Sequence, residues 1–126
     1  MAALVFDSGA LIALERGDRR VAALLVAAAE GGAEAVTSSA CVAQVWRNPA
    51  RQARLTRALA GFVECELDPR RARDCGTLLA RSETLDIADA AVSLLADDGD
   101  TVLTSDPQDI QHLLSAAGTQ ARVRPV

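Results

Sequence analysis

The chain has 126 residues, a net charge of −4 and 50% hydrophobic residues, which is the balance of a single folded domain covering residues 1–126. All 13 basic residues are arginine and there is one histidine, so the composition excludes a phosphate-binding lysine, a Schiff-base lysine and a poly-histidine zinc site. With 2% aromatic residues, the chain offers little for RNA-binding sheets that work by base stacking.

The apolar segments are short and interrupted. None reaches the roughly 18 residues of a membrane span, and no charged segment precedes the first apolar stretch. We therefore expect neither a membrane anchor nor a secretory signal. The three cysteines have no spacing typical of a metal site, and an odd count argues against a disulfide framework. We interpret them as small packing residues in a reducing cytoplasm.

Apolar runs alternate with helical segments along the whole chain. Five runs are predicted to be strands, at residues 3–6, 35–37, 63–67, 101–104 and 121–126. The intervening segments are predicted to be helices, at 10–16, 19–30, 39–47, 49–62, 69–80, 85–96 and from 107 onward. Strands separated by such helices pair in parallel through right-handed crossovers. The sequence thus predicts a three-layer α/β/α fold with a parallel sheet of four or five strands.

Helical spacing assigns buried faces to two of these helices. The residues concerned are Leu55, Leu59 and Phe62 in one helix, and Ile87, Ala91, Leu94 and Leu95 in the other.

Carboxylates follow two of the predicted strands. Asp7 comes directly after the first strand, and Asp106 lies two residues after the fourth, with Asp109 three residues further on. Asp86 and Asp89 lie near the start of the preceding helix. Function in an open parallel sheet sits at the carboxyl ends of the strands, so we expect these acids to converge on one crevice. Crowded carboxylates repel one another unless a cation lies among them, and hard oxygen ligands suit Mg²⁺ or Mn²⁺.

A structural interpretation stays open for most of these acids. Asp86, Asp89, Asp106 and Asp109 occupy positions where acidic residues cap helix starts. The alternative for Asp7 is an ordinary turn residue at the end of a strand. No basic residue and no predicted cap role nearby explains an acid there, so Asp7 favours a functional interpretation most strongly.

Charge is segregated along the chain. Residues 47–81 hold eight arginines against four acids, and residues 82–121 hold eight acids and no arginine. Arg47, Arg54 and Arg57 are candidate contacts to nucleic-acid phosphates, the alternative being a solvated face. Arg51 falls on the predicted apolar face of its helix.

Three segments resemble the acidic motifs of PIN domains, especially the VapC-type toxins of bacterial toxin–antitoxin pairs. They are Val5-Phe6-Asp7-Ser8-Gly9-Ala10-Leu11-Ile12-Ala13-Leu14, Asp89-Ala90-Ala91-Val92 and Thr104-Ser105-Asp106-Pro107-Gln108-Asp109-Ile110. The three motifs occur in the order and at the spacing of the family, and the resemblance covers the whole chain. The resemblance implies a PIN-like fold and a cytoplasmic endoribonuclease that uses Mg²⁺ or Mn²⁺, forms a homodimer and is silenced by a small antitoxin.

The resemblance also implies roles for individual residues. Asp7, Asp89 and Asp106 would be catalytic and hold the metal, with Asp109 and Asp86 as further candidate ligands. Gln44, Ser8, Thr104 and Ser105 would line the site, and Arg47, Arg54 and Arg57 would contact RNA.

The chain departs from the family pattern at two positions. Gln44, in Ala43-Gln44-Val45, stands where the family has a glutamate; it keeps the shape and loses the negative charge. Gly9 stands where a small hydroxyl residue is common.

Gln44 motivates a second hypothesis, a PIN-fold protein that binds a partner or RNA without turnover. A third hypothesis, a receiver or dehalogenase-like phosphate enzyme, is disfavoured because those families use a lysine in the site and this chain has none.

Overall fold

The computed structural model describes residues 2–126 and contains, within them, one parallel sheet of five strands in the order β3-β2-β1-β4-β5. The strands are β1 Leu4–Phe6, β2 Ala35–Ser38, β3 Val63–Cys65, β4 Thr101–Thr104 and β5 Arg122–Pro125. The helices are α1 Ser8–Glu15, α2 Arg19–Glu30, α3 Ser39–Val45, α4 Ala53–Leu59, α5 Pro69–Ser82, α6 Ile87–Leu95 and α7 Pro107–Ala117, with a 3₁₀ turn, η1, at Pro49–Arg51. The predicted fold class and all five predicted strands are confirmed.

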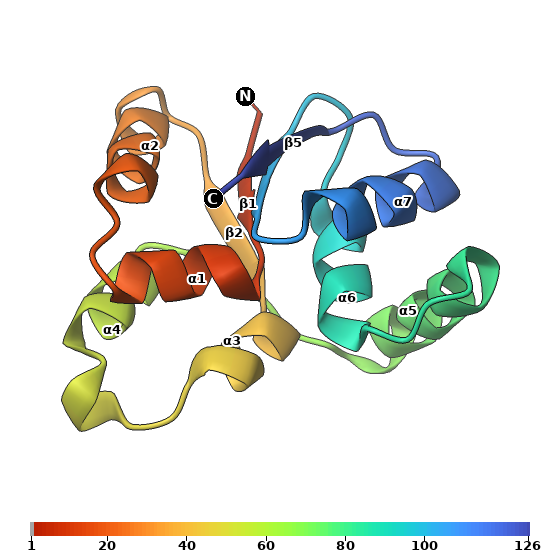
Figure 1. The fold of residues 1–126 in the computed structure, drawn as a ribbon, viewed down its shortest axis with the longest axis horizontal. Coiled ribbons are helices and arrows are strands. Elements are labelled where there is room, and N and C mark those ends of the chain that lie inside the picture. Colours follow the sequence, from red (N-terminus) through yellow and green to blue (C-terminus); the bar gives the residue numbers. More distant parts are fainter. Residues whose placement is uncertain (1) are drawn as a thin grey trace.

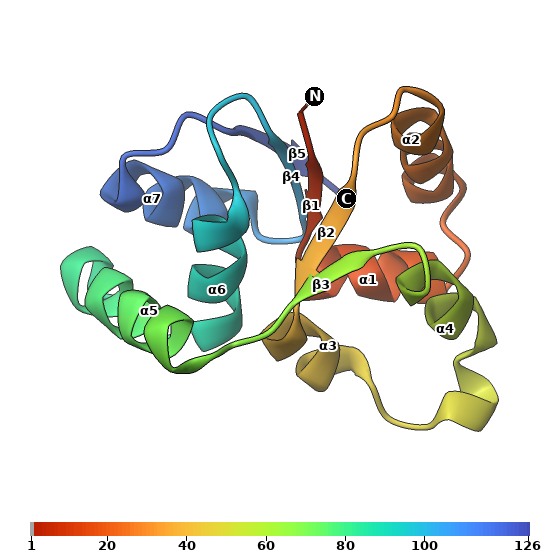
Figure 2. The ribbon, with the colours of Figure 1, turned by 180° about the vertical axis from the view of Figure 1, so that it is seen from behind.

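The helices form two layers around the sheet. Figure 1 shows α1, α2 and α4 on one side and α5, α6 and α7 on the other, and Figure 2 shows the same arrangement from behind. Helix α3 lies beyond the carboxyl ends of the strands, next to α1 and α6. None of the helices within residues 2–126 is long and apolar enough to cross a bilayer.

The strand order reverses direction at the centre of the sheet. From β1 the chain builds outward to β2 and β3, then crosses back over the sheet through α5 and α6 to place β4 on the other side of β1. Parallel crossovers are right-handed, so the two halves carry their helices on opposite faces. The reversal leaves a crevice beyond the carboxyl ends of β1 and β4, where open α/β sheets bind ligands.

Strand β1 consists only of apolar residues because it lies in the middle of the core. All three of its residues are buried, because both faces of a central parallel strand are covered by helices. Phe6 packs edge-on against Phe62 with 4.8 Å between the ring centroids. Leu11, Leu103 and Ile110 are fully buried around it, which fixes α1, β4 and α7 against each other.

The prediction of one helix over residues 49–62 is wrong. Asn48 caps the short turn η1, and a separate helix, α4, begins after Gln52; Phe62 lies beyond its end. The break is stabilised by the Gln52 side chain, which is buried. Its Oε1 accepts hydrogen bonds from the backbone N–H groups of Arg47 at 2.9 Å and Asn48 at 3.1 Å, and its Nε2 donates to the Val45 carbonyl at 2.8 Å.

The predicted apolar face of α6 is also partly wrong. Ile87 is 54% exposed and Leu94 is 39% exposed, whereas Ala88 and Val92 face the core. Helix α6 packs on the sheet and α3 as well as on α5 and α7, so small residues around most of its circumference are buried. A helix buried on several sides loses the one-sided pattern on which the prediction depended.

The Gln52 hydrogen bonds yield a stability prediction. Gln52→Ala should lower the free energy of unfolding by about 1–3 kcal/mol, because it leaves buried backbone groups without partners. Urea unfolding followed by circular dichroism measures the change. Gln111→Ala is the matched control, since this exposed amide makes only one hydrogen bond of 3.5 Å to Ser115. Equal, small losses in both variants would contradict the role assigned to Gln52.

Candidate active site

The predicted acidic residues converge at the crevice between β1 and β4. Asp7 follows β1 and precedes α1, Asp89 lies in the first turn of α6, and Asp106 and Asp109 lie at the start of α7. These elements meet at the carboxyl edge because the crossover places β4 beside β1. Residues more than 80 positions apart therefore form one site.

Three carboxylates form the tightest group. One oxygen from each of Asp89, Asp106 and Asp109 lies within 4.8 Å of the others. Asp89 is half-buried, and the other two are exposed. Asp109, expected only as a further candidate, is a full member of this group, which we call the acidic triad.

Asp89 experiences the strongest electrostatic conflict. Burial is the largest cause, and repulsion from Asp86, Asp7, Asp106 and Asp109 follows in that order. Together they raise the pKa of Asp89 from 3.8 to about 7. At neutral pH this carboxyl group is therefore close to half-protonated in the protein without a cation. A bound divalent ion would remove both the proton and the repulsion.

Asp7 lies beneath the triad rather than within it. It is 2% exposed, and the prediction that it has no cap role is wrong. Helix α1 begins at Ser8, two residues earlier than expected, and Asp7 caps it by accepting the N–H of Ala10 at 2.8 Å. Its second oxygen accepts the N–H of Ser105 at 3.3 Å.

Burial raises the pKa of Asp7 above its ordinary value, and repulsion from Asp106 raises it further. Hydrogen bonds from Thr104, Ala10 and Ser105 act against this shift. Thr104 also contacts Asp106: its hydroxyl oxygen accepts the backbone N–H of Asp106 at 2.8 Å. Thr104 thereby links Asp7 to the chain that carries Asp106.

The alternative interpretation, that these acids cap helices, holds for Asp86 and does not hold for Asp106. Asp86 is a cap: its carboxylate accepts the N–H of Asp89 at 2.9 Å. It stands outside the triad and contributes repulsion. Asp106 occupies the N-cap position of α7 without making a side-chain cap hydrogen bond. Its carboxylate is therefore directed to the triad instead of to the helix.

Gln44 lies beside the site on α3. Its amide oxygen accepts a hydrogen bond of 2.5 Å from the hydroxyl of Ser8, the first residue of α1. The side chain is exposed. The structure thus joins two residues that were predicted to line the site.

Ser105 explains the departure at Gly9. A Cβ atom on Gly9 would lie 2.1 Å from the Ser105 hydroxyl oxygen and 2.5 Å from its Cβ atom, so a side chain there would require Ser105 to move. The space that a hydroxyl residue at position 9 would fill is occupied by the hydroxyl of Ser105. Sequence reasoning missed this pairing, because no spacing rule connects residues 96 positions apart.

The three arginines predicted to contact RNA lie in different places. Arg47 lines the same hollow as Gln44 and donates hydrogen bonds to the carbonyls of Ala43 and Trp46. The guanidinium of Arg54 lies over Gly17, and Arg57 lies in the last turn of α4. Only Arg47 among the three borders the hollow that Gln44 lines.

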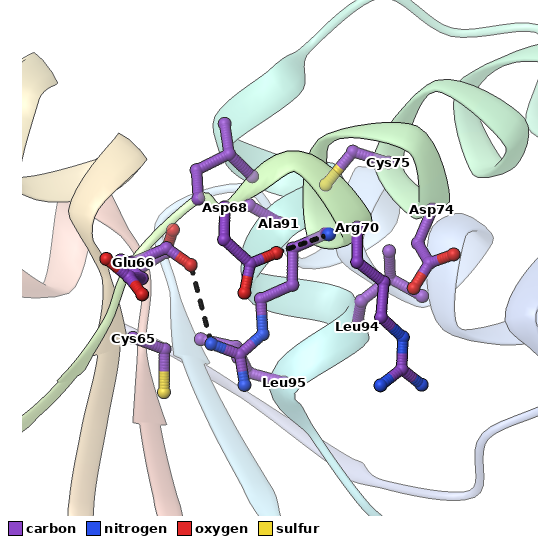
Figure 3. Close-up of a pocket in the computed structure, with 12 residues that line it drawn as sticks. Cys65, Glu66, Asp68, Arg70, Asp74, Cys75, Ala91, Leu94 and Leu95 are labelled. Atoms are coloured by element: carbon purple, nitrogen blue, oxygen red, sulfur yellow. Dashed lines mark hydrogen bonds between the residues drawn. The ribbon is translucent and has the colours of Figure 1, made fainter.

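A separate hollow of about 300 Å³ lies between β3, α5 and α6. Figure 3 shows Glu66, Asp68 and Asp74 around it beside Arg70, with Cys65 and Cys75 also at its wall. None of the acidic triad lines it. It is distinct from the candidate active site.

The strand order and the two helix layers give an α/β/α domain with an acidic crevice at the carboxyl edge of its sheet. Neither a protein-family model nor a curated protein sequence matches the chain. Among solved structures, a chain in the crystal structure of VapBC2 from Rickettsia felis bound to a DNA fragment from their promoter has a TM-score of 0.68 and 11% sequence identity. The match covers 98% of this chain and 99% of that chain. At this identity the likeness establishes the fold, and it confirms the VapC-like fold indicated by the motifs.

The raised pKa of Asp89 predicts how stability depends on pH. The folded protein binds this proton more tightly than the unfolded chain, so an ionised Asp89 opposes folding, increasingly so as the pH rises from 3.8 to about 7. In EDTA the melting temperature should fall between about pH 5 and about pH 8. Asp89→Asn should reduce that fall and stabilise the protein at the higher pH by on the order of 1–2 kcal/mol, after allowance for solvent screening.

Thermal unfolding at both pH values measures this effect. Asp97→Asn is the matched control, because Asp97 is exposed in the loop before β4, at the opposite edge of the sheet. If Asp89→Asn and Asp97→Asn gave the same profile as the native chain, the assigned repulsion would be wrong.

Proposed function

We propose that this protein is a metal-dependent endoribonuclease that cleaves RNA phosphodiester bonds. The observation that carries the proposal is the acidic triad, three carboxylates that each have an oxygen within 4.8 Å of the others. These carboxylates repel one another, and a divalent cation bound among them would attract all three. The VapC-like fold supports the same reaction class.

The donor set fits Mg²⁺ or Mn²⁺. The triad offers only carboxylate oxygens, on the exposed side of the crevice where waters and a phosphate can approach, and these hard ions prefer such ligands. Asp89, Asp106 and Asp109 would hold the ion. When bound, it would activate water and neutralise charge on the phosphate under attack.

The remaining residues position this group. Asp7 anchors the start of α1 and, through Thr104, the chain leading to Asp106. In the proposal Asp7 acts from beneath the triad by adding negative potential. Ser8 and Gln44 border the site, and the amide of Gln44 orients a phosphate or a water by hydrogen bonding.

A second candidate function follows from Gln44. A neutral amide at this position lowers the negative charge available to a cation, which favours a protein that binds RNA or a partner without turnover. The two functions differ in the role of charge at one residue, and one substitution separates them.

The proposal extends to partners. VapBC2, the structural neighbour, was crystallised as a complex bound to promoter DNA. By analogy with it, we propose a small antitoxin protein that silences the nuclease, a homodimer of this chain and a cytoplasmic site of action. RNA is the proposed substrate.

Cleavage of RNA by the purified protein tests the main proposal. We expect cleavage with Mn²⁺ or Mg²⁺ that is lost in EDTA and falls by more than about 100-fold in Asp89→Asn and Asp106→Asn. Asp7→Asn should also abolish cleavage while the protein stays folded. Gel electrophoresis of a labelled RNA measures the rate, and Asp97→Asn, remote from the triad, should cleave normally. Metal-dependent cleavage that survives Asp89→Asn would refute the assignment.

Gln44→Glu separates the two functions. If the native chain is a nuclease, the added carboxylate should tighten Mn²⁺ binding, measured by calorimetry, and change an activity that is already present. If cleavage appears only in Gln44→Glu, the native chain is the binding module. Gln111→Glu, which adds the same charge on α7, controls for net charge.

A further inference from the structure

A hollow of about 610 Å³ lies between α1 and the segment that follows α3. Three arginines line it: Arg16 from the end of α1, Arg47 after α3, and Arg51 in η1. Gln44 and Glu15 also line it. We call this surface the arginine groove.

The charge of the arginine groove distinguishes it from the other hollow. Three arginines face one acid, Glu15, which leaves a balance of +2 in a protein whose net charge is −4. The hollow of Figure 3 holds two arginines against three acids, a balance of −1. A third hollow, between α7 and β5, has one arginine, Arg122, and no acid. The arginine groove therefore has the largest positive balance of these three hollows.

The groove is continuous with the candidate active site through one residue. Gln44 lines the groove and accepts the hydrogen bond from Ser8, which directly follows Asp7. Helix α1 runs from that junction to the far end of the groove, eight residues or about 12 Å. That length accommodates more than one phosphate of a nucleic-acid strand.

Two of the three arginines, Arg47 and Arg51, lie on a segment that hydrogen bonds hold in place. The buried Gln52 side chain binds the backbone N–H groups of Arg47 and Asn48, and the Arg47 side chain donates to the carbonyls of Ala43 and Trp46. Asn48 in turn accepts the N–H of Ala50 at 3.0 Å, which shapes η1 and places Arg51. A segment held in this way loses little entropy when it binds a ligand.

We propose that the arginine groove binds backbone phosphates of single-stranded RNA on one side of the scissile bond, so that the strand leaves the acidic triad past Gln44. The inference rests on the proposed nuclease function. Guanidinium groups bind phosphate oxygens through paired hydrogen bonds, and the acidic triad alone would repel the strand. An acidic protein segment is the competing ligand, and the groove's continuity with a site suited to phosphate chemistry favours RNA.

Equilibrium binding of a fluorescein-labelled single-stranded RNA of about 12 nucleotides tests the proposal. Fluorescence anisotropy is measured in EDTA, in the Asp89→Asn background, so that no cleavage interferes. Arg16→Gln/Arg47→Gln/Arg51→Gln should weaken binding by about 10- to 100-fold at moderate salt and reduce the slope of log Kd against log salt by about 2. The same positions changed to lysine should recover most of the affinity.

Arg70→Gln/Arg73→Gln/Arg81→Gln is the matched control, because it removes the same charge from α5, away from the groove. Equal weakening in the two triple variants, or native affinity in the groove variant, would overturn the proposal. Binding of polyglutamate, which represents an acidic protein segment, is measured in the same way. A groove variant that keeps RNA binding and loses only polyglutamate binding would also overturn the proposal, because the groove would then fit an acidic protein. If the triple variant fails to fold, Arg16→Gln/Arg51→Gln, which keeps the contacts of Arg47, should still lower the slope by about 1.4, and an unchanged slope would be a refutation.

The binding readout separates this inference from the proposed function. If the native chain binds RNA through the arginine groove but never cleaves it, the proposed nuclease function is refuted. The proposal that the groove binds RNA then still stands. If the groove variant shows metal-dependent cleavage with an unchanged KM and unchanged RNA binding, the nuclease function is supported and the role of the groove is refuted.

Discussion

Mutual repulsion of carboxylates at the centre of the sheet is the constraint on which the rest of this structure depends. The chain crossing from β3 to β4 puts four acids from three segments into one crevice, and a fifth, Asp86, adds its field. The fold relieves this repulsion only in part. Asp7 receives hydrogen bonds from the backbone and from Thr104, whereas Asp89 is left with a pKa of about 7. A site kept unfavourable in this way is typical of binding centres, which trade stability for function.

Aspartate side chains have two different roles in this crevice. Asp86 and Asp7 accept backbone N–H groups at helix starts, so their carboxylates are fixed by the fold. Asp106 has the sequence signature of a cap, with Pro107 behind it, but makes no cap hydrogen bond. Its N–H is bound by Thr104 instead, and its carboxylate is left to the acidic triad. Asp86 and Asp7 thus fix helix starts, whereas the unused cap position of Asp106 leaves its carboxylate in the acidic triad.

The sequence was informative where local chemistry decides the structure. Apolar runs located all five strands, since buried parallel strands need no alternation, and the order of the acidic motifs located the crevice. It was uninformative where distant partners decide. Helix α6 buries small residues on most sides because three helices and two strands surround it. The partners of Gln52 are close in sequence, but its three hydrogen bonds to backbone groups form only in the folded geometry. The fit of Ser105 against Gly9 depends on the assembled fold, as does the displacement of Asp7 beneath the triad.

Gln44 lies where two opposite electrostatic demands meet. In the proposed function the triad needs negative charge to hold a cation, and in the proposed strand path the arginine groove needs the absence of such charge to admit phosphates. A glutamate at this junction would strengthen the first and oppose the second, because its charge would face the path of the strand. A glutamine keeps the hydrogen bond to Ser8 and adds no charge to that path. With Asp109 placed among the metal-binding candidates, the triad keeps three carboxylates without a glutamate, so the position can serve the strand instead.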